Sequence, residues 1–351
     1  MNLPKYQQIA EILREEIIKG TYAVGNVIPT EAKLQEQFDV SRHTIRQALS
    51  ILINEGYLRS EKGSGTYVKN RLIESTNNNP TRKIGVITTY LSDYIFPNII
   101  RGIEEVLRQN NYSLVLASTD NDIVQEEICL KRMLDEEVAG LIVEPTKSNL
   151  FNPNIAYYSK FKELGIPILF INAHYETLDL PYIAMDDRKA AQKATEFWLK
   201  QGITNIGLIT KIDDLQGKLR MKGFIKAFEE EGVSFSKEAI HTYTTETLDT
   251  ALANIANQIL NDETTTRTFV CYNDKVALKL QQLVASKSPI LGSKLQLSSH
   301  DNSILSVVGG FSSVQHIKDE LGRIAANKMI ESIEKNKVIE TEIFVGELVE
   351  R

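Results

Sequence analysis

The sequence has 351 residues, 42% of them hydrophobic and 25% charged, which is an ordinary globular composition with room for one small domain and one larger domain. It contains no apolar run of membrane-spanning length, and charges are spread through its first 18 residues, so we expect a cytoplasmic protein with neither a signal peptide nor a membrane partner. Cys129 and Cys271 lie too far apart in the sequence for a paired zinc motif or a disulfide framework, so we expect two core thiols and no bound metal.

The charge is unevenly distributed along the chain. The net charge is −6, yet residues 1–71 carry 10 Lys and Arg against 8 Asp and Glu, whereas the remainder carries 30 against 38. A surface that binds nucleic-acid phosphates is therefore expected in the N-terminal part.

Three helical patterns open the chain. The first occupies residues 4–19, where apolar residues recur with helical spacing. Thr30 is a natural N-cap for a short second helix, and Ser41 is one for a third helix that ends at Gly56. Residues 57–68 then predict two short strands around a glycine-rich turn. Three helices and a hairpin are the pattern of a winged helix-turn-helix.

The third predicted helix carries polar side chains at its N-terminal end, where a recognition helix reads base edges in the major groove. Arg42 and Arg46 lie one helical turn apart, so one can reach a guanine and the other a backbone phosphate. In the hairpin turn, Gly63 and Gly65 would let the backbone approach DNA, and Lys62 would add positive charge. An isolated pair of arginines has a plainer explanation as solvated helix charges, and their placement argues against it here.

Residues 4–69 resemble the DNA-binding domain of the GntR family. The match is carried by Pro4-Lys5-Tyr6, Ile28-Pro29-Thr30-Glu31, Val40-Ser41-Arg42-His43-Thr44-Ile45-Arg46, Gly56-Tyr57-Leu58 and Gly63-Ser64-Gly65-Thr66-Tyr67-Val68. The resemblance implies binding to double-stranded operator DNA, and the candidate DNA-binding residues are Lys5, Thr30, Ser41, Arg42, His43, Thr44, Arg46, Lys62, Gly63, Ser64 and Gly65. Many members of this family carry arginine where this chain has Ala32, so we expect a different operator sequence.

Residues 70–82 contain little that could pack a core and are expected to be a linker between domains covering residues 1–69 and 83–351. From residue 83 onward, strand-like apolar runs alternate with amphipathic stretches long enough for crossover helices. The runs are residues 84–88, 113–117, 140–144, 167–172, 182–185, 205–210, 268–272 and 295–299. Such alternation predicts parallel sheets covered on both faces, and this number of strands suits two lobes better than one sheet.

Polar and aromatic residues follow several of these runs, at the carboxyl ends of strands where open α/β sheets bind ligands. Carboxylates, amides, an arginine and flat rings suit a sugar, because bidentate polar groups satisfy neighbouring hydroxyls while a ring covers the apolar face. The candidate effector-binding residues are Asp93, Tyr94, Phe96, Glu144, Asn172, Asp214, Gln216, Arg220, Asn273 and Asp301. Asn273, Asp274 and Asp301 also fit helix N-caps, Arg220 a surface charge or an interlobe salt bridge, and Tyr94 and Phe96 the core.

Residues 83–351 resemble the effector-binding domain of the LacI/GalR family, which is itself similar to periplasmic sugar-binding proteins. The resemblance is carried by Lys83-Ile84-Gly85-Val86-Ile87, Ile183-Ala184-Met185-Asp186-Asp187, Arg220-Met221-Lys222-Gly223-Phe224, Tyr272-Asn273-Asp274-Lys275-Val276-Ala277-Leu278 and His300-Asp301. It implies a two-lobed α/β fold, a homodimer, and contacts to sugar hydroxyls from Arg220, Asp301 and Asn273. The chain departs from the family pattern at residues 309–316, a region that joins the lobes, so we expect an altered strength of switching.

Over its whole length the chain resembles the arabinose-responsive repressors of Gram-positive bacteria, which combine these two domains. The matches at predicted strand ends, residues 88–97, 142–148, 171–173 and 213–217, imply L-arabinose or a related sugar as the effector. The fold expected is thus a two-lobed periplasmic-binding-protein-like α/β domain with a small N-terminal winged helix-turn-helix, and the function a repressor that L-arabinose releases from operator DNA. No cofactor is expected.

Three alternatives stay open on the sequence. The same scaffold could answer to another sugar or to a nucleoside. A solute-binding protein would fit the larger domain, although the helix-turn-helix and the missing signal peptide count against it. An enzyme is disfavoured, because the sequence holds no nucleophile elbow, phosphate-binding P-loop or metal-ligand cluster, and its five histidines are scattered.

Overall fold

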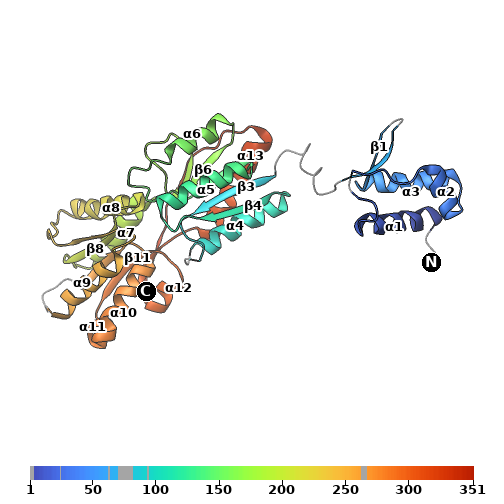
Figure 1. Ribbon diagram of the computed structural model, residues 1–351. Helices are drawn as coiled ribbons and strands as arrows, with labels where there is room; N and C mark the ends of the chain where they lie inside the picture. Colours follow the sequence, from blue (N-terminus) through green and yellow to red (C-terminus); the bar gives the residue numbers. More distant parts are fainter. Residues whose placement is uncertain (1–3, 24, 62–63, 70–81, 93–94, 262–266) are drawn as a thin grey trace. The chain divides into compact units, whose positions relative to one another are not determined.

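The computed structural model describes residues 4–23, 25–61, 64–69, 82–92, 95–261 and 267–351. The chain divides into two compact units, residues 1–81 and 82–351, and each is described by itself (Figure 1). The first is a winged helix-turn-helix and the second a two-lobed α/β domain, which confirms the predicted fold class. Residues 70–81 of the predicted linker lie outside the described residues. No described helix has both the length and the apolar character needed to span a bilayer.

The first unit builds one small core from the predicted helices and hairpin. Its elements are α1 (Lys5–Ile18), α2 (Glu31–Phe38), α3 (Arg42–Asn54), β1 (Leu58–Glu61) and β2 (Gly65–Val68). The two strands pair antiparallel, with Leu58 opposite Val68. The core residues include Ile9, Leu13, Leu34, Ile45, Leu52 and Leu58. Because α3 turns Ile45 and Leu52 into this core, Arg42 and His43 of its first turn remain exposed and Thr44 is partly exposed.

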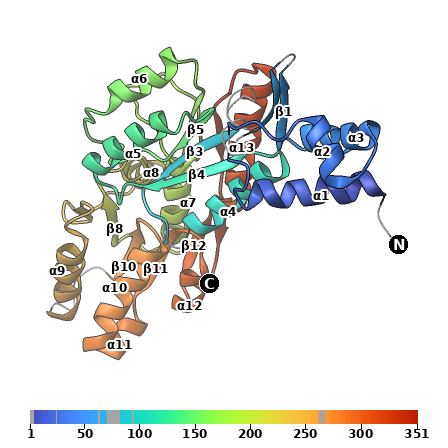
Figure 2. The same ribbon diagram turned by 45° about the vertical axis from the view of Figure 1, so that its right-hand side comes forward.

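The first lobe of the larger unit is a parallel sheet with the strand order β13-β7-β6-β5-β3-β4. Its strands are β3 (Lys83–Thr88), β4 (Ser113–Ser118), β5 (Gly140–Val143), β6 (Ile168–Ile171), β7 (Tyr182–Met185) and β13 (Glu342–Phe344). Its helices are α4 (Phe96–Gln109), α5 (Ile123–Asp135), α6 (Ile155–Glu163) and α13 (Lys318–Lys335). Figure 2 shows α4 and α13 on one side of the sheet and α5 and α6 on the other.

The second lobe is a sheet with the order β14-β12-β11-β10-β8-β9, parallel except for its edge strand β14. Its strands are β8 (Ile206–Lys211), β9 (Ile240–Tyr243), β10 (Thr268–Cys271), β11 (Gln296–Asp301), β12 (Ser312–Gln315) and β14 (Leu348–Val349). Its helices are α7 (Asp187–Leu199), α8 (Leu215–Glu231), α9 (Leu248–Asn261), α10 (Asp274–Lys287), α11 (Pro289–Ser293) and α12 (Ile304–Gly309).

The continuous apolar runs of the sequence become strands that are buried on both faces. In β3, Val86 packs with α4 and α13, whereas its neighbour Ile87 packs with α5 and α6. In the second lobe, Leu208 faces the α7–α8 side and Ile209 the α9–α10 side. Successive side chains point to opposite faces of a strand, so a doubly covered sheet needs apolar residues at every position. This confirms the reading of these runs as parallel strands.

Three segments connect the two lobes within the described residues. The first lies between β7 and α7, the second is residues 315–318 between β12 and α13, and the third lies between β13 and β14. The second and third touch, because a Cβ added to Gly346 would lie 2.2 Å from the Gln315 carbonyl oxygen. Of residues 309–316, which were predicted to join the lobes, only residues 315 and 316 belong to the second connection, and the others lie in α12, β12 and the turn between them in the second lobe.

Four strands lie outside the predicted runs: β9, β12, β13 and β14. They are short, and most of their residues are polar or partly exposed. Strand β12 reads Ser-Ser-Val-Gln, yet Ser312 and Ser313 are fully buried. The Ser313 hydroxyl donates to the Asp274 carboxylate (2.6 Å), a partner 39 residues away that no local pattern reveals.

Candidate functional site

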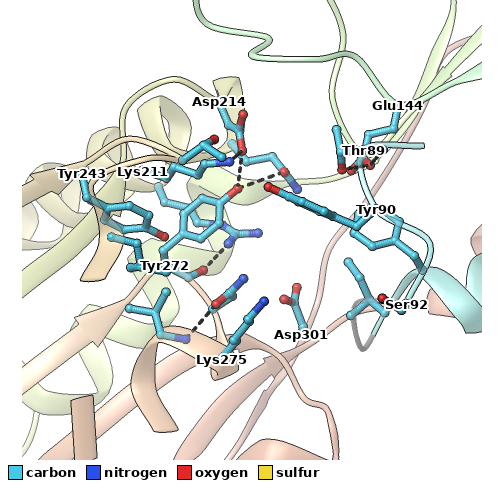
Figure 3. A pocket seen from close by; sticks show the side chains of 18 residues that line it. Thr89, Tyr90, Ser92, Glu144, Lys211, Asp214, Tyr243, Tyr272, Lys275 and Asp301 are labelled. Carbon is cyan, nitrogen blue, oxygen red and sulfur yellow. Dashed lines mark hydrogen bonds and ion pairs between the residues drawn. The ribbon is translucent and has the colours of Figure 1, made fainter. Parts of the chain in front are cut away.

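The two lobes enclose a cavity of about 340 Å³ at the carboxyl ends of their strands (Figure 3). The first lobe contributes Thr89, Tyr90, Ser92, Ile95, Phe96 and Glu144 to its lining. The second contributes Lys211, Asp214, Gln216, Arg220, Tyr243, Thr245, Leu248, Tyr272, Asn273, Lys275, Val276 and Asp301. The lining therefore combines both signs of charge, amides and several aromatic rings, and it depends on both lobes.

The structure brings most of the predicted effector residues together in this cavity. Those that line it are Phe96, Glu144, Asp214, Gln216, Arg220, Asn273 and Asp301. They come from the ends of four strands in two sheets and from helices α4 and α8, as expected for the carboxyl edge of parallel sheets. The predicted residues Asp93 and Tyr94 lie outside the described residues.

The structure differs from the prediction at Asn172, which is absent from the described lining and lies behind Glu144. Asn172 directly follows β6 and adopts a left-handed φ of 63°. Its amide nitrogen donates to Oε1 of Glu144 (3.1 Å), and its side-chain oxygen lies 3.2 Å from Nε2 of His316. The expectation that a residue after a strand faces the ligand fails here because these two buried partners hold the amide.

Glu144 ends the run of β5 with its carboxylate inside the cavity wall. The Thr89 amide donates to Oε2 (3.0 Å), the Thr89 hydroxyl donates to the same oxygen, and Asn172 serves Oε1. Burial raises the pKa of Glu144 to about 7, although these hydrogen bonds lower it. The group therefore changes between acid and carboxylate near neutral pH.

Arg220 is held rigidly against the cavity by partners in its own lobe. Its Nε and Nη2 lie 2.8 Å and 2.7 Å from Oδ1 of Asp187, and Nη1 donates to the Tyr272 carbonyl. Its guanidinium carbon lies 4.7 Å from the centre of the Tyr272 ring. Burial raises the pKa of Asp187 to about 6, although Arg220 lowers it. The ion pair lies within the second lobe, so it is not the interlobe bridge considered as an alternative.

The alternative role in helix capping applies to one of the three residues considered for it, and Asp274 is the first residue of α10 rather than its cap. Asn273 caps α10, since its side-chain oxygen accepts from the Val276 amide (3.0 Å), and it also lines the cavity. Asp301 ends β11 with a φ of 96°, and Ser303 is the cap of the following helix. Asp301 therefore reaches the cavity without serving as an N-cap.

Several lining residues were not predicted. Lys211, 7% exposed, donates to Asp214 (2.7 Å), and the Tyr272 hydroxyl lies 3.2 Å from the same carboxylate. Tyr90 points across the cavity toward Tyr272 (Figure 3). The sequence did hold a signal for two of them. Lys211 is the last residue of the apolar strand β8, and Tyr272 directly follows the apolar strand β10. For Tyr90, two residues past β3, the sequence gives no direction for the side chain.

The exposed end of α3 carries the predicted DNA-reading residues. Ser41 caps the helix by accepting from the Thr44 amide (3.3 Å), and the two hydroxyls lie 2.9 Å apart. Arg42 and Arg46, 63% and 59% exposed, both pair with Glu31 of α2 at 2.7 Å and 3.0 Å. Glu31 was not predicted as part of this surface, and its negative charge gave no reason to expect it on a surface that binds DNA.

The remaining predicted DNA-binding residues surround this helix end or form the hairpin. Lys5 and His43 are exposed, and Thr30 caps α2 by accepting from the Lys33 amide (3.4 Å). In the hairpin, the Ser64 hydroxyl lies 2.5 Å from that of Tyr67, and Gly65 has a φ of 139°, which favours glycine. Lys62 and Gly63 lie outside the described residues.

Comparison with known families divides the chain in the same way as the structure. Residues 5–68 match the bacterial regulatory proteins of the gntR family, and residues 81–344 match the family of periplasmic binding proteins and sugar binding domains of the LacI family.

Two similar relatives match almost the entire chain. The arabinose metabolism transcriptional repressor of Halalkalibacterium halodurans is 38% identical over 341 residues, which cover 95% of this chain and 90% of the relative. The protein with the same description from Geobacillus stearothermophilus is 38% identical over 340 residues, covering 96% of this chain and 93% of the relative.

Solved structures resemble the larger unit. The transcription regulator CcpA of Lactococcus lactis has a TM-score of 0.67 at 21% identity and covers 77% of this chain and 98% of its own. The lac repressor dimer bound to operator and the anti-inducer ONPF has a TM-score of 0.67 at 18% identity and covers 81% of this chain and 98% of its own. At these identities the likeness shows the two-lobed fold.

Proposed function

This chain belongs to the family of periplasmic binding proteins and sugar binding domains of the LacI family and carries a gntR-family DNA-binding domain, and from this membership we propose that it represses arabinose-utilisation genes until L-arabinose occupies the interlobe cavity. The two domains and the 38% identical relatives fit a ligand-responsive, DNA-binding repressor. The identity of the sugar and the release of DNA are the parts that we propose.

The observation that carries the proposal is the composition of the cavity. Arg220 and Asp301 lie on the second lobe and Glu144 on the first, so charged donors and acceptors approach a ligand from both sides. Tyr90 and Phe96, with ring centres 6.1 Å apart, and Tyr272 supply flat apolar surfaces. A compact neutral polyol fits such a site, because its hydroxyls act as donors to carboxylates and as acceptors from arginine, while its ring carbons cover an aromatic face.

The DNA-binding end of the proposal rests on α3 and the hairpin. Arg42 and Arg46 are exposed at the helix end that Ser41 caps, so the first-turn side chains and the free amides face the same way. We assign base or phosphate contacts to the candidate residues of this surface. Two copies of the chain would present two such helices to an operator with two half-sites, and we propose a homodimer as the active form.

Titration calorimetry of the full chain with a panel of pentoses, hexoses and nucleosides tests the ligand. We expect L-arabinose to bind most tightly and to be recovered unchanged, since we propose binding without turnover. Asp301→Asn should weaken binding about tenfold, because a charged acceptor becomes a neutral amide. Lys237→Ala, a change at a side chain that is 89% exposed, is the matched control. No heat with L-arabinose together with tight binding of another ligand would refute the assignment.

A further inference from the structure

The second connection between the lobes contains a buried histidine that is linked by hydrogen bonds to the cavity. His316 is 6% exposed and lies between β12 and α13. Its Nε2 lies 3.2 Å from Oδ1 of Asn172, whose Nδ2 donates to Oε1 of Glu144 (3.1 Å). A chain of two hydrogen bonds therefore runs from the connection to a carboxylate of the cavity lining.

The direction of these hydrogen bonds follows from chemistry when Glu144 is ionised. An ionised Glu144 can only accept, so the NH₂ group of Asn172 must face it and the amide oxygen must face His316. Burial lowers the pKa of His316 to about 3, so its ring is neutral at physiological pH. The proton of the neutral ring then sits on Nε2, where it donates to Asn172.

A purely structural role explains His316 poorly. Its Nδ1 has no hydrogen-bond partner among the residues that the structure describes, and an unpaired buried nitrogen destabilises a fold. An apolar residue of similar size would fill the space without that cost. The hydrogen bond between Nε2 and Asn172 is the contact through which the ring can act on the cavity.

The same connection is also tied to the other lobe. Two residues after His316, the Lys318 ammonium donates to the carbonyl oxygens of Asp301 and Asn302, the latter at 3.0 Å. Asp301 lines the cavity from the second lobe, as Glu144 does from the first. This short segment is thus bonded to Asn172, the neighbour of Glu144, in the first lobe and to the backbone of Asp301 in the second lobe.

Movement of this segment would be passed on as a rigid shift. Lys318 is the first residue of α13, and α13 packs closely against α4 where each helix has a glycine. A Cβ on Gly322 would lie 2.1 Å from the Ile99 carbonyl oxygen, and one on Gly102 would lie 2.1 Å from that of Asp319. Because α4 begins at Phe96 in the cavity lining, this helix pair and the segment must adjust together when a ligand engages the lining.

We propose that His316 and Lys318 are positioning residues that couple occupancy of the cavity to the arrangement of the lobes, and through it to operator release. His316 is connected to the first lobe through its hydrogen bond to Asn172, which bonds to Glu144, and Lys318 is connected to the second lobe through the Asp301 carbonyl oxygen. This inference rests on the proposed function, since it assigns the path by which the bound sugar acts.

The test separates sugar binding from sugar response. The full chain carries His316→Leu, which removes the donor, or His316→Gln, whose amide places a donor near the same point. Sugar affinity is measured by calorimetry with L-arabinose. Operator affinity, with and without the sugar, is measured on double-stranded DNA selected by the wild-type chain from a random pool. His241→Leu, on β9 away from the connection, is the matched control.

We expect His316→Leu to bind L-arabinose within about threefold of wild type while the sugar-induced loss of operator affinity shrinks about tenfold. His316→Gln should restore the response, and His241→Leu should leave it intact. Lys318→Met, which removes the other tether, should also reduce the response and keeps the proposal testable if His316→Leu does not fold.

Three outcomes overturn the proposal, and they are distinguishable. If wild type responds to L-arabinose and both His316→Leu and Lys318→Met respond equally, the coupling role fails while the proposed function stands. If wild type binds no L-arabinose, or releases no DNA on binding it, the proposed function fails and the coupling role fails with it. Loss of response in His316→Gln equal to that in His316→Leu would also contradict a role for the hydrogen bond.

Discussion

Glu144 brings a pH-dependent acceptor to the cavity. Its carboxylate is buried, and burial raises its pKa to about 7. The ionised form is the stronger acceptor for a sugar hydroxyl, so affinity should rise as the pH rises through that value. We expect wild-type affinity for L-arabinose to increase up to about tenfold between pH 6 and pH 8 and then to level off.

Glu144→Gln provides the control for this pH dependence. The amide cannot ionise, so its affinity should be nearly constant over the same range. Calorimetric titrations of both proteins in matched buffers make the comparison. An equally steep change of affinity with pH in Glu144→Gln would assign the pH dependence to another group. Asp187 is one such group, because burial raises the pKa of its carboxyl to about 6.

Arg220 and Asp187 form a buried pair whose disruption should be measurable as stability. Arg220 is 3% exposed and Asp187 is 2% exposed, so removing the arginine leaves a carboxylate buried without its partner. We expect Arg220→Ala to lower the free energy of unfolding by about 3–5 kcal/mol. Arg188→Ala, at an exposed position one residue after Asp187, should change it by less than about 0.5 kcal/mol. Urea unfolding of the full chain, followed in the effector domain, measures both, and a small loss in Arg220→Ala would show that the pair is weakly coupled.

At the scale of single elements, the caps of the DNA-binding helices are the clearest sequence features. The Ser41 hydroxyl accepts from the Thr44 amide at the start of α3. Ser41→Ala should destabilise the first unit by about 1 kcal/mol, because a first-turn amide loses its partner. Ser50→Ala, at an exposed position within the same helix, should be neutral or slightly stabilising. Thermal unfolding monitored in the first unit distinguishes them, and equal effects of the two changes would contradict the capping role.

The elements that sequence patterns predict best are those whose signal is local. The caps at Thr30 and Ser41 form as expected, because each precedes a stretch of apolar residues with helical spacing. Strands β3 and β8 also form as expected, because a strand buried on both faces is a continuous run of apolar residues. Strand β12 escaped prediction because its buried Ser313 donates to Asp274, a distant partner. The cavity lining was predicted in part for the same reason. Polar residues at strand ends could be recognised from the sequence, whereas the positions of Asn172 and Tyr90 relative to the cavity depend on side-chain directions that only the folded sheet sets.

At the scale of the whole effector unit, the lobes already touch around the cavity. The Ser148 hydroxyl accepts from the Leu215 amide at the start of α8 (2.8 Å), and Lys218 of the second lobe pairs with Glu176 of the first (2.6 Å). These contacts hold polar groups of both lobes within reach of one ligand. A sugar that bonds to Glu144 and Asp301 at once therefore acts on the relation between the lobes, which is the quantity a two-lobed sensor can transmit.

The central claim is that sugar binding in one unit controls DNA binding in the other. The most direct measurement is the electrophoretic mobility shift of operator DNA selected by the wild-type chain, with and without L-arabinose, for wild type, Arg42→Ala and Arg220→Lys. We predict that L-arabinose abolishes the wild-type shift, that Arg42→Ala gives none, and that Arg220→Lys gives a shift the sugar does not change. A wild-type shift that persists at saturating L-arabinose, or a sugar-sensitive shift in Arg220→Lys, would contradict the account.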